Sequence, residues 1–217
     1  MDAWHERLIR VGLDAVAADF GFALAGGYAV NAHGVVRRPS DDVDLFTSIE
    51  RSREMGAATD RVAAAYEAGG CAVEVGLRSD RYVRLNVADP AIGRASKVDL
   101  VAEFLEHPPV ASPWGPVLHL DDVAAGKVGA LFARAEARDF IDVEGLLRAG
   151  YSRDRLLELA RRRDRGFHNG VFADMLGSLA RFSDREFARY EVDDEQVTRL
   201  RAEFADWKRR LVEDLER

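Results

Sequence analysis

The chain has 217 residues, of which 47% are hydrophobic and 32% are charged, and its formal net charge is −7. This composition is typical of a globular protein with a sizeable core, and the length allows one large domain or two small ones. The negative charge argues against a protein that binds polyanions over its whole surface. A single cysteine, Cys71, excludes a disulfide framework within the chain, which suits a reducing cytoplasm.

The first twenty residues contain acids and no long apolar core, so they do not resemble a signal peptide. No apolar run reaches the length that spans a bilayer. We therefore expect a cytoplasmic protein with no membrane partner.

The first half of the chain alternates helical and strand patterns. Apolar residues at helical spacing predict a helix over 3–19, and the short apolar run 22–25 predicts a buried strand. The elements expected after these are a short helix at 28–34, a strand at 42–46, a helix at 50–68, and strands at 71–77, 81–87 and 96–101.

The second half has a different character. Residues 107–116 hold four of the six prolines, which predicts a boundary or an exposed loop, and the PVLHL that begins at Pro116 is a candidate for one last strand. Helices are expected at 121–135, 138–149, 152–164, 169–182 and 193–217, with Asp121 or Asp122, Ser152 and Ser183 as N-caps. The outline is an α/β half over 1–120 and a helical half over 121–217.

Gly26 and Gly27 join the first strand to the next helix. Glycine lets the backbone approach a ligand closely, and the free N–H groups at a helix start favour an anion. Many such joints use glycine for geometry alone, so this pair leaves both interpretations open.

Asp42 and Asp44 lie two residues apart in an expected strand, so they share one face while Val43 and Leu45 enter the core. Carboxylates so close repel one another unless a cation lies between them, and a hard divalent cation such as Mg²⁺ resolves that conflict. The alternative is a solvated edge strand with its polar residues outward.

A third carboxylate is expected from another apolar strand. We favour Asp99, whose neighbours Val98 and Leu100 mirror those of Asp44. Glu74 and Asp89 are the alternatives.

The run that begins at Gly26 (GGYAVNAHG, then RRPSDDVD) resembles the signature of the DNA polymerase β-like nucleotidyltransferase superfamily. Its form is most similar to the AbiEii/MenT group, toxins of bacterial toxin–antitoxin pairs. The segment 127–147 resembles the block K-x-x-A-L-x-x-R…RD-x-x-D-L of that group. Gly27 stands where many relatives have serine, so a hydroxyl contact to phosphate is missing here.

The resemblance implies an α+β fold: a polymerase β-like domain over 1–120, with a mixed sheet and flanking helices, and a helical domain over 121–217 that completes the active site. It implies Mg²⁺-dependent transfer of NMP from NTP to the 3′ end of a tRNA, which inhibits translation and growth. It also implies a cognate antitoxin protein as a partner.

The resemblance gives Asp42 and Asp44 the role of Mg²⁺ ligands, with Asp99 as a third ligand or as the base for the acceptor proton. It makes Gly26 and Gly27 the cradle of the β- and γ-phosphates.

The basic and acidic residues nearer the helical half receive the remaining roles. Arg38, from the pair Arg37-Arg38, is expected to contact the nucleotide, although a solvated loop is equally open. Lys127 is expected to stabilise charge on the triphosphate. The resemblance favours Asp139 as a catalytic residue, whereas Asp142 is expected to be structural.

Two other functions remain open. The glycine and Asp-x-Asp block is also similar to aminoglycoside and lincosamide adenylyltransferases, which modify a small hydroxylated acceptor, and a catalytically inactive binding module is the third possibility. The segment 148–168 holds seven arginines against three acids, which favours a polyanion over a cationic drug. A solvated helix face is the simpler interpretation of that segment.

Overall fold

The structure is a computed structural model, and it describes residues 2–217. The chain forms two compact units. The first unit contains the residues up to Ala32 together with Pro39–Leu120, and the second contains His33–Arg38 together with Asp121–Arg217. The short segment His33–Arg38 therefore packs with the second unit although residues of the first unit flank it in the sequence.

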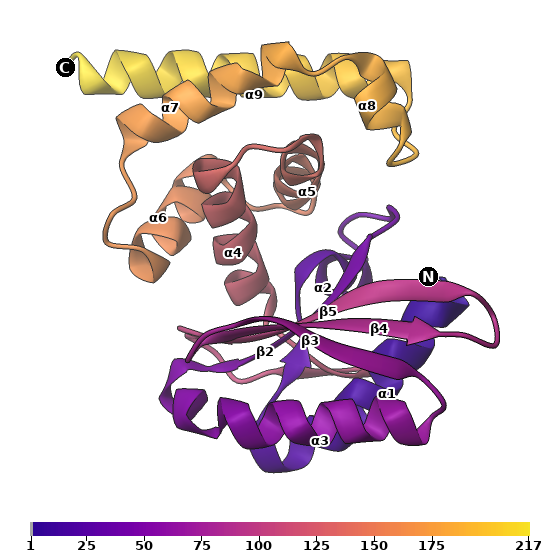
Figure 1. The fold of residues 1–217 in the computed structure, drawn as a ribbon. Coiled ribbons are helices and arrows are strands. Elements are labelled where there is room, and N and C mark those ends of the chain that lie inside the picture. Colours follow the sequence, from indigo (N-terminus) through magenta and orange to yellow (C-terminus); the bar gives the residue numbers. More distant parts are fainter. Residues whose placement is uncertain (1) are drawn as a thin grey trace. The chain divides into compact units, whose positions relative to one another are not determined.

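The first unit is built on a seven-stranded mixed sheet in the order β3-β4-β5-β2-β1-β7-β6. Figure 1 labels β2, β3, β4 and β5 of this sheet. Strands β2 and β5 are parallel, as are β1 and β7, and the other neighbours are antiparallel. The strands are β1 (Ala23–Leu24), β2 (Asp42–Ser48), β3 (Ala72–Arg78), β4 (Tyr82–Asp89), β5 (Arg94–Glu103), β6 (Val110–Ser112) and β7 (Gly115–Val117). A mixed sheet with helices confirms the expected α+β class.

Helices α1 (Ala3–Phe20) and α3 (Met55–Ala68) pack against each other and against one face of this sheet, while the short α2 (Gly26–Ala32) joins β1 to the loop before β2. Asp2 caps α1, and its carboxylate accepts the N–H of Trp4 at 2.9 Å. A Cβ on Gly12 would lie 2.9 Å from Leu45 Cδ1, so α1 can approach β2 closely only because that residue is glycine. Leu45 thus defines the core side of the sheet.

The second unit contains helices only among its described elements: α4 (Leu120–Ala133), α5 (Ala137–Arg148), α6 (Arg153–Arg163), α7 (Asn169–Gly177), α8 (Asp184–Ala188), α9 (Asp194–Leu215) and the short 3-10 turn η2 (Ser178–Arg181). Its core is aromatic. Phe172 packs edge-on against Trp207 at 5.4 Å between ring centroids, and Phe140 packs against Phe204 at 5.1 Å. These rings hold α5, α7 and α9 together.

Several boundaries differ from the sequence expectation. The helix expected at 50–68 begins as a 3-10 turn, η1 (Ile49–Glu54), and the helix expected at 169–182 ends as η2. Ser152 and Ser183 are N-caps, as expected, but Asp121 and Asp122 lie inside the first turn of α4.

The proline-rich segment, for which the sequence predicted a boundary or an exposed loop, forms a small hairpin. Strands β6 and β7 pair across Pro113-Trp114, and Gly115 adopts a φ of 118° that an L side chain rarely takes. Pro113 lies in the turn of this hairpin, whereas Pro116 lies in β7, between β1 and the edge strand β6. Among residues 2–217, no helix is both long and apolar enough to cross a membrane.

Candidate active site

Two aspartates project from β2 on the face of the sheet opposite the core. Val43 and Leu45 are 0% exposed, whereas Asp42 and Asp44, which alternate with them, are partly exposed. The two-residue period of a strand produces this separation. The predicted placement of the two carboxylates on one face is therefore observed.

Asp99 lies beside this pair. Strands β2 and β5 run parallel with Asp44 opposite Asp99, and residues in register on neighbouring strands point to the same face. The two alternatives lie elsewhere: Asp89 forms an ion pair with Arg7 at 2.5 Å, and Glu74 is exposed on the edge strand β3. The sheet thus brings together Asp42, Asp44 and Asp99.

An arginine and a tyrosine from β4 bind the carboxylate of Asp99. Arg84 donates from Nε to Oδ1 at 2.8 Å and from Nη2 to Oδ2 at 2.6 Å, and the Tyr82 hydroxyl donates to Oδ2 at 3.0 Å. The hydrogen bond to Asp99 raises the pKa of Arg84, and burial together with the charge of Asp99 raises the pKa of Tyr82 to about 12. Both donors are protonated at neutral pH.

The sequence analysis did not identify these two residues. A signal was present, because Tyr82, Arg84 and Asn86 alternate with buried valine and leucine residues and so occupy one face of β4. The missing information was that β4 and β5 are neighbours with Arg84 opposite Asp99.

Gly26, the first residue of α2, brings the start of this helix against Asp44. Its φ is 61°, and a Cβ at this position would lie 1.7 Å from Oδ2 of Asp44. The N–H of Ala25 donates to the backbone carbonyl of Asp44 at 2.8 Å. Gly27 follows as a buried residue of α2. The glycine turn and the aspartate strand therefore form one local structure, and only glycine fits at position 26.

These residues fit a divalent cation. The donor set consists of carboxylate oxygens, the ligands that Mg²⁺ prefers, and the strand register places Asp44 opposite Asp99, with Asp42 two residues along the same strand. Gly26 itself has no side chain, so its backbone can lie directly against the Asp44 carboxylate.

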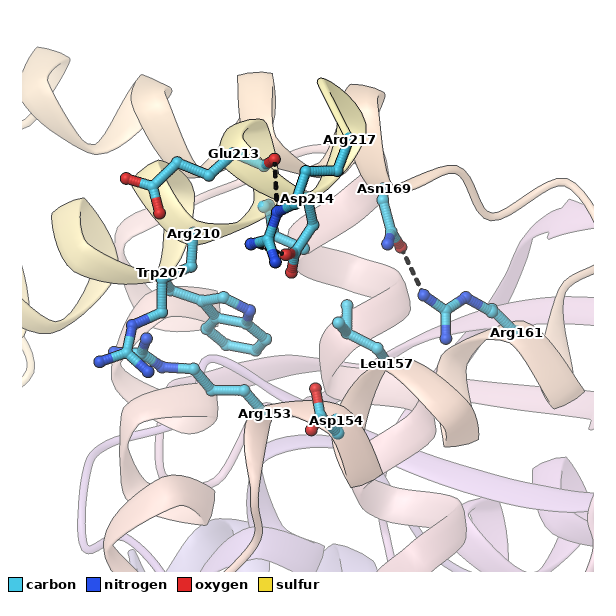
Figure 2. A pocket seen from close by; sticks show the side chains of 11 residues that line it. Arg153, Asp154, Leu157, Arg161, Asn169, Trp207, Arg210, Glu213, Asp214 and Arg217 are labelled. Atoms are coloured by element: carbon cyan, nitrogen blue, oxygen red, sulfur yellow. Dashed lines mark hydrogen bonds and ion pairs between the residues drawn. The ribbon is translucent and has the colours of Figure 1, made fainter.

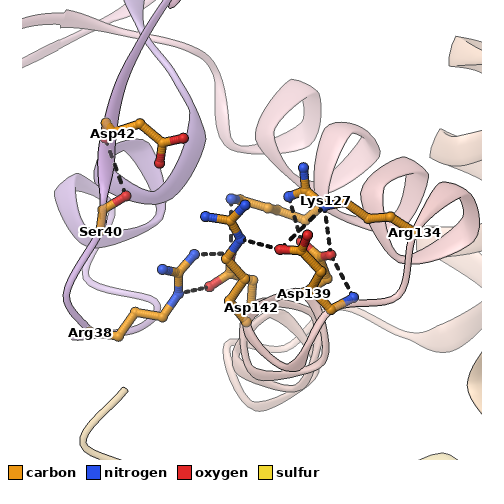
Figure 3. Close-up of polar contacts among 9 residues, drawn as sticks. Arg38, Ser40, Asp42, Lys127, Arg134, Asp139 and Asp142 are labelled. Carbon is orange, nitrogen blue, oxygen red and sulfur yellow. Dashed lines mark hydrogen bonds and ion pairs between the residues drawn. The ribbon is translucent and has the colours of Figure 1, made fainter. Parts of the chain in front are cut away.

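The second unit contains a separate buried cluster around Asp142, which is 0% exposed (Figure 3). Arg38 donates to both of its oxygens at 2.7 and 2.6 Å, and Lys127 Nζ lies 2.8 Å from Oδ2. Burial opposes ionisation, but the charge of Lys127 and the hydrogen bonds of Arg38 hold the pKa of Asp142 below its ordinary value. The carboxylate is ionised and fixes both cations.

Asp139 lies in a different environment, one helical turn away. It is 0% exposed, accepts the N–H of Glu136 at the start of α5, and binds Arg134 at 2.9 and 3.0 Å. The contact with Lys127 belongs to Asp142, which the sequence analysis had expected to be structural. A catalytic role for Asp139 stays a prediction.

The arginine-rich segment 148–168 is less basic in the structure than its sequence indicates. Arg148 pairs with Glu144 and Arg155 with Asp121, both outside the segment. Arg153 binds Glu203 and Asp206 of α9. The last turn of α6 holds three arginines, residues 161–163, of which Arg162 lies 3.8 Å from Glu158.

Arg153 also borders a polar pocket of about 740 Å³ between α6 and α9 (Figure 2). Its guanidinium lies 5.8 Å from the ring of Trp207, which is 1% exposed. Because the indole is already covered, it offers no open face for a base to stack upon. The pocket is lined by Arg153, Asp154, Leu157, Arg161, Asn169, Trp207, Arg210, Leu211, Glu213, Asp214 and Arg217.

The site residues expected from the sequence thus fall into two groups. Gly26, Gly27 and the three aspartates 42, 44 and 99 belong to the first unit, whereas Arg38, Lys127 and Asp139 belong to the second.

Comparison with known proteins gives a consistent family. The model of the family described as "Nucleotidyl transferase AbiEii toxin, Type IV TA system" matches residues 7–217. Among solved structures, JHP933 from Helicobacter pylori has a TM-score of 0.57 and 17% identity, over 98% of this chain and 94% of that chain. MenT4, a nucleotidyltransferase toxin from Mycobacterium tuberculosis H37Rv, has a TM-score of 0.62 and 18% identity, over 96% of this chain and 85% of that chain.

At 17% and 18% identity, the solved structures show a shared fold. No curated protein matches the chain. The family model carries the assignment because it spans nearly the whole chain. The chain is a nucleotidyltransferase and belongs to the AbiEii family of toxins from type IV toxin–antitoxin systems.

Proposed function

We propose that this toxin transfers a nucleoside monophosphate from an NTP to the 3′ end of a tRNA, with Mg²⁺ as the metal, and so blocks translation. Family membership implies the NTP substrate and an antitoxin partner. The observation that carries the proposal is the in-register placement of Asp44 and Asp99 beside the Gly26 turn.

The metal ligands in this proposal are Asp42 and Asp44, with Asp99 as the third. A bound Mg²⁺ supplies charge neutralisation to the attacking and leaving oxygens of the phosphoryl group. The strand fixes the two aspartates at a two-residue spacing, so the chain holds its carboxylates in position before any ligand arrives.

The backbone at Gly26 and Gly27 provides the surface for the β- and γ-phosphates. Because Gly26 and Gly27 have no side chains, the backbone here can approach a phosphate closely beside Asp44. The acceptor hydroxyl attacks the α-phosphorus in line, and pyrophosphate leaves. The protein contributes mainly positioning and charge, as in other phosphoryl transfers.

Lys127 is the cation proposed for the triphosphate. Asp142 holds its ammonium at 2.8 Å, and Arg38 shares the same carboxylate. Two cations share this carboxylate, and a fixed ammonium of this kind suits a polyphosphate ligand. A direct contact of Arg38 with the nucleotide, and a catalytic role for Asp139, are the other parts of this proposal.

We also propose that the first unit has the polymerase β-like nucleotidyltransferase fold and that the helical residues from 121 onward form a domain that completes the active site. The mixed sheet with Asp-x-Asp on β2 and a third aspartate on the parallel neighbour β5 supports this assignment.

The tRNA acceptor rests on the similarity to the toxin group and on the basic last turn of α6, Arg161, Arg162 and Arg163, which suits contacts with phosphates. A toxin acting on tRNA operates in the cytoplasm, which is the compartment that the single cysteine favours.

The test incubates purified protein with total tRNA, Mg²⁺ and each α-³²P-labelled NTP in turn. We expect labelled tRNA with one or two NTPs, and at least about a 1000-fold lower rate in Asp44→Asn, because a metal ligand is lost. Asp60→Asn, which removes an exposed carboxylate from α3, is the matched control and retains the activity.

Periodate oxidation of the tRNA ribose tests the site of transfer, because it destroys the 3′ hydroxyl. The tRNA is oxidised before the assay, and label incorporated into this oxidised tRNA would place the transfer elsewhere on the RNA. Absence of label with every NTP, in protein that still binds Mg-NTP, would contradict the tRNA acceptor and point to a small-molecule or protein hydroxyl.

A further inference from the structure

Two side chains of β4, Arg84 and Tyr82, bind Asp99 on the face of the sheet that also carries Asp42 and Asp44. Arg84 and Tyr82 make three hydrogen bonds to a carboxylate that is 5% exposed, and the strand pairing sets Arg84 directly opposite Asp99. The guanidinium also lies 5.7 Å from the ring of Tyr82. Each of the three residues is thereby restrained by the other two.

These bonds determine which oxygen of Asp99 is available. An ionised carboxylate has about four acceptor positions, two on each oxygen. Oδ2 accepts from both Arg84 and Tyr82, so its positions are filled, whereas Oδ1 accepts only from Arg84 Nε. One position, on Oδ1, remains for a further partner.

We propose that Arg84, assisted by Tyr82, is a positioning residue that presents Oδ1 of Asp99 to the metal beside Asp44 and competes with the metal for that carboxylate. This inference rests on the proposed metal-dependent transfer. It makes Asp99 a ligand of limited strength, held in a fixed orientation. It also assigns a function to an arginine that the sequence motifs do not include.

The competition follows from charge. A guanidinium on the same carboxylate lowers its attraction for a cation, and a forked pair fixes the carboxylate plane. Removing Arg84 therefore has two opposite effects. Asp99 becomes a stronger but less ordered ligand, so metal affinity rises while the rate of transfer falls.

The experiment measures both quantities on the full chain. Mn²⁺ binding is followed by the electron paramagnetic resonance signal of the free ion, and transfer kinetics are measured with the NTP and tRNA of the main assay. In Arg84→Gln we expect Mn²⁺ to bind about 3- to 10-fold more tightly, because a partly exposed ion pair no longer competes. We expect kcat to fall about 10- to 100-fold, with KM for NTP within about twofold of wild type.

Two further variants separate charge from geometry. Arg84→Lys keeps the charge but cannot form the fork, so the Mn²⁺ affinity stays near that of wild type while kcat still falls. Tyr82→Phe removes one donor to Oδ2 and lowers kcat by about 3- to 10-fold. Arg94→Gln, which breaks the exposed ion pair with Asp2 at the other end of β5, is the matched control and changes neither quantity.

Unchanged or weaker Mn²⁺ binding in Arg84→Gln, with a rate loss that matches a loss of folded protein, would overturn the inference and leave Arg84 as a structural residue. That result is distinct from a failure of the proposed function. If wild type does not bind Mn²⁺, or Asp44→Asn binds it equally well, the metal site itself is wrong and the role of Arg84 falls with it.

Discussion

The sheet face of the first unit and the buried cluster of the second unit hold carboxylates in opposite ways. Asp42 and Asp44 are partly exposed and lie side by side on one strand. Asp142 is 0% exposed, and Arg38 and Lys127 bind it directly. An exposed pair of like charges can accept a cation from solution, whereas a buried carboxylate with two cations fixes those cations in place.

The difference also separates the energetic roles of the two regions. The carboxylates of the sheet face are partly exposed, so removing one is expected to affect metal binding more than folding. Removing the buried carboxylate takes away the negative charge that two cations share in a poorly hydrated site, so it affects folding strongly. The predictions below test this contrast.

The largest expected effect on stability is that of Asp142→Asn. The substitution keeps the shape of the side chain but removes the buried charge that Arg38 and Lys127 share, and we expect a loss of about 3 to 5 kcal/mol in the free energy of unfolding. Urea unfolding followed by circular dichroism measures it.

Glu144→Gln is the matched control on the same helix, because Glu144 pairs with the exposed Arg148. That variant is expected to change the free energy of unfolding by less than about 1 kcal/mol. If Asp142→Asn lowers the free energy of unfolding by less than about 1 kcal/mol, the buried cluster does not contribute more to stability than an exposed ion pair.

Gly26→Ala tests how tightly the turn and the aspartate strand are joined. The new Cβ meets Oδ2 of Asp44 at 1.7 Å, and alanine is strained at a φ of 61°. We expect a loss of about 2 to 3 kcal/mol in stability, of which about 1 kcal/mol is backbone strain. The transfer rate is expected to fall by at least about 100-fold because the Asp44 carboxylate must move.

Gly34→Ala is the control that measures only the stability lost when alanine adopts a positive φ. Gly34 has a φ of 70°, and no atom lies within 4 Å of an added Cβ. It is expected to lose about 1 kcal/mol of stability. If both variants retain the same transfer rate, contact between the turn and Asp44 is unimportant for activity.

The sheet face could be predicted from the sequence because its information is local. The two-residue period placed Asp42 and Asp44 together, and apolar neighbours identified Asp99 as a strand residue. The contact of Arg84 with Asp99 was not predicted, because it depends on which strand lies next to β5. Sequence periodicity gives the face of a strand, but not its neighbour.

The buried cluster could be predicted only in part. The motif identified Lys127, but the hydrogen bonds between Arg38 and Asp142 join residues 104 positions apart. No local pattern contains such a contact, so Asp142 was expected to be structural without its partners Arg38 and Lys127 being identified. Short elements were missed for a related reason: α8 has five residues, too few to show a helical period.

Asp139→Asn separates the two aspartates of α5. The new carboxamide keeps an oxygen for the Glu136 N–H but loses the ion pair with Arg134, whose side chain is 47% exposed. We expect a stability loss of about 1 to 2 kcal/mol, smaller than for Asp142→Asn. If Asp139 is catalytic, as the family resemblance implies, the transfer rate of the folded protein falls by at least about 100-fold.

The control for this variant is Arg134→Gln, which removes the same ion pair from its exposed side. Equal rates in both variants after correction for the folded fraction would limit Asp139 to capping and ion pairing. A much lower rate in Asp139→Asn alone would support the catalytic assignment.

The smallest expected effect is the change with pH in the stability that the buried Asp142 contributes. Lys127 and Arg38 hold the folded pKa of Asp142 below its ordinary value, so its stabilising contribution is present above the unfolded pKa of about 3.9. The contribution is lost as the pH falls through the folded pKa. The stability gap between wild type and Asp142→Asn is therefore widest from about pH 5 upward and narrows at lower pH. Urea unfolding at pH 7, 5, 4 and 3 measures the gap, and a constant gap would show that Asp142 does not titrate differently in the folded and unfolded chains.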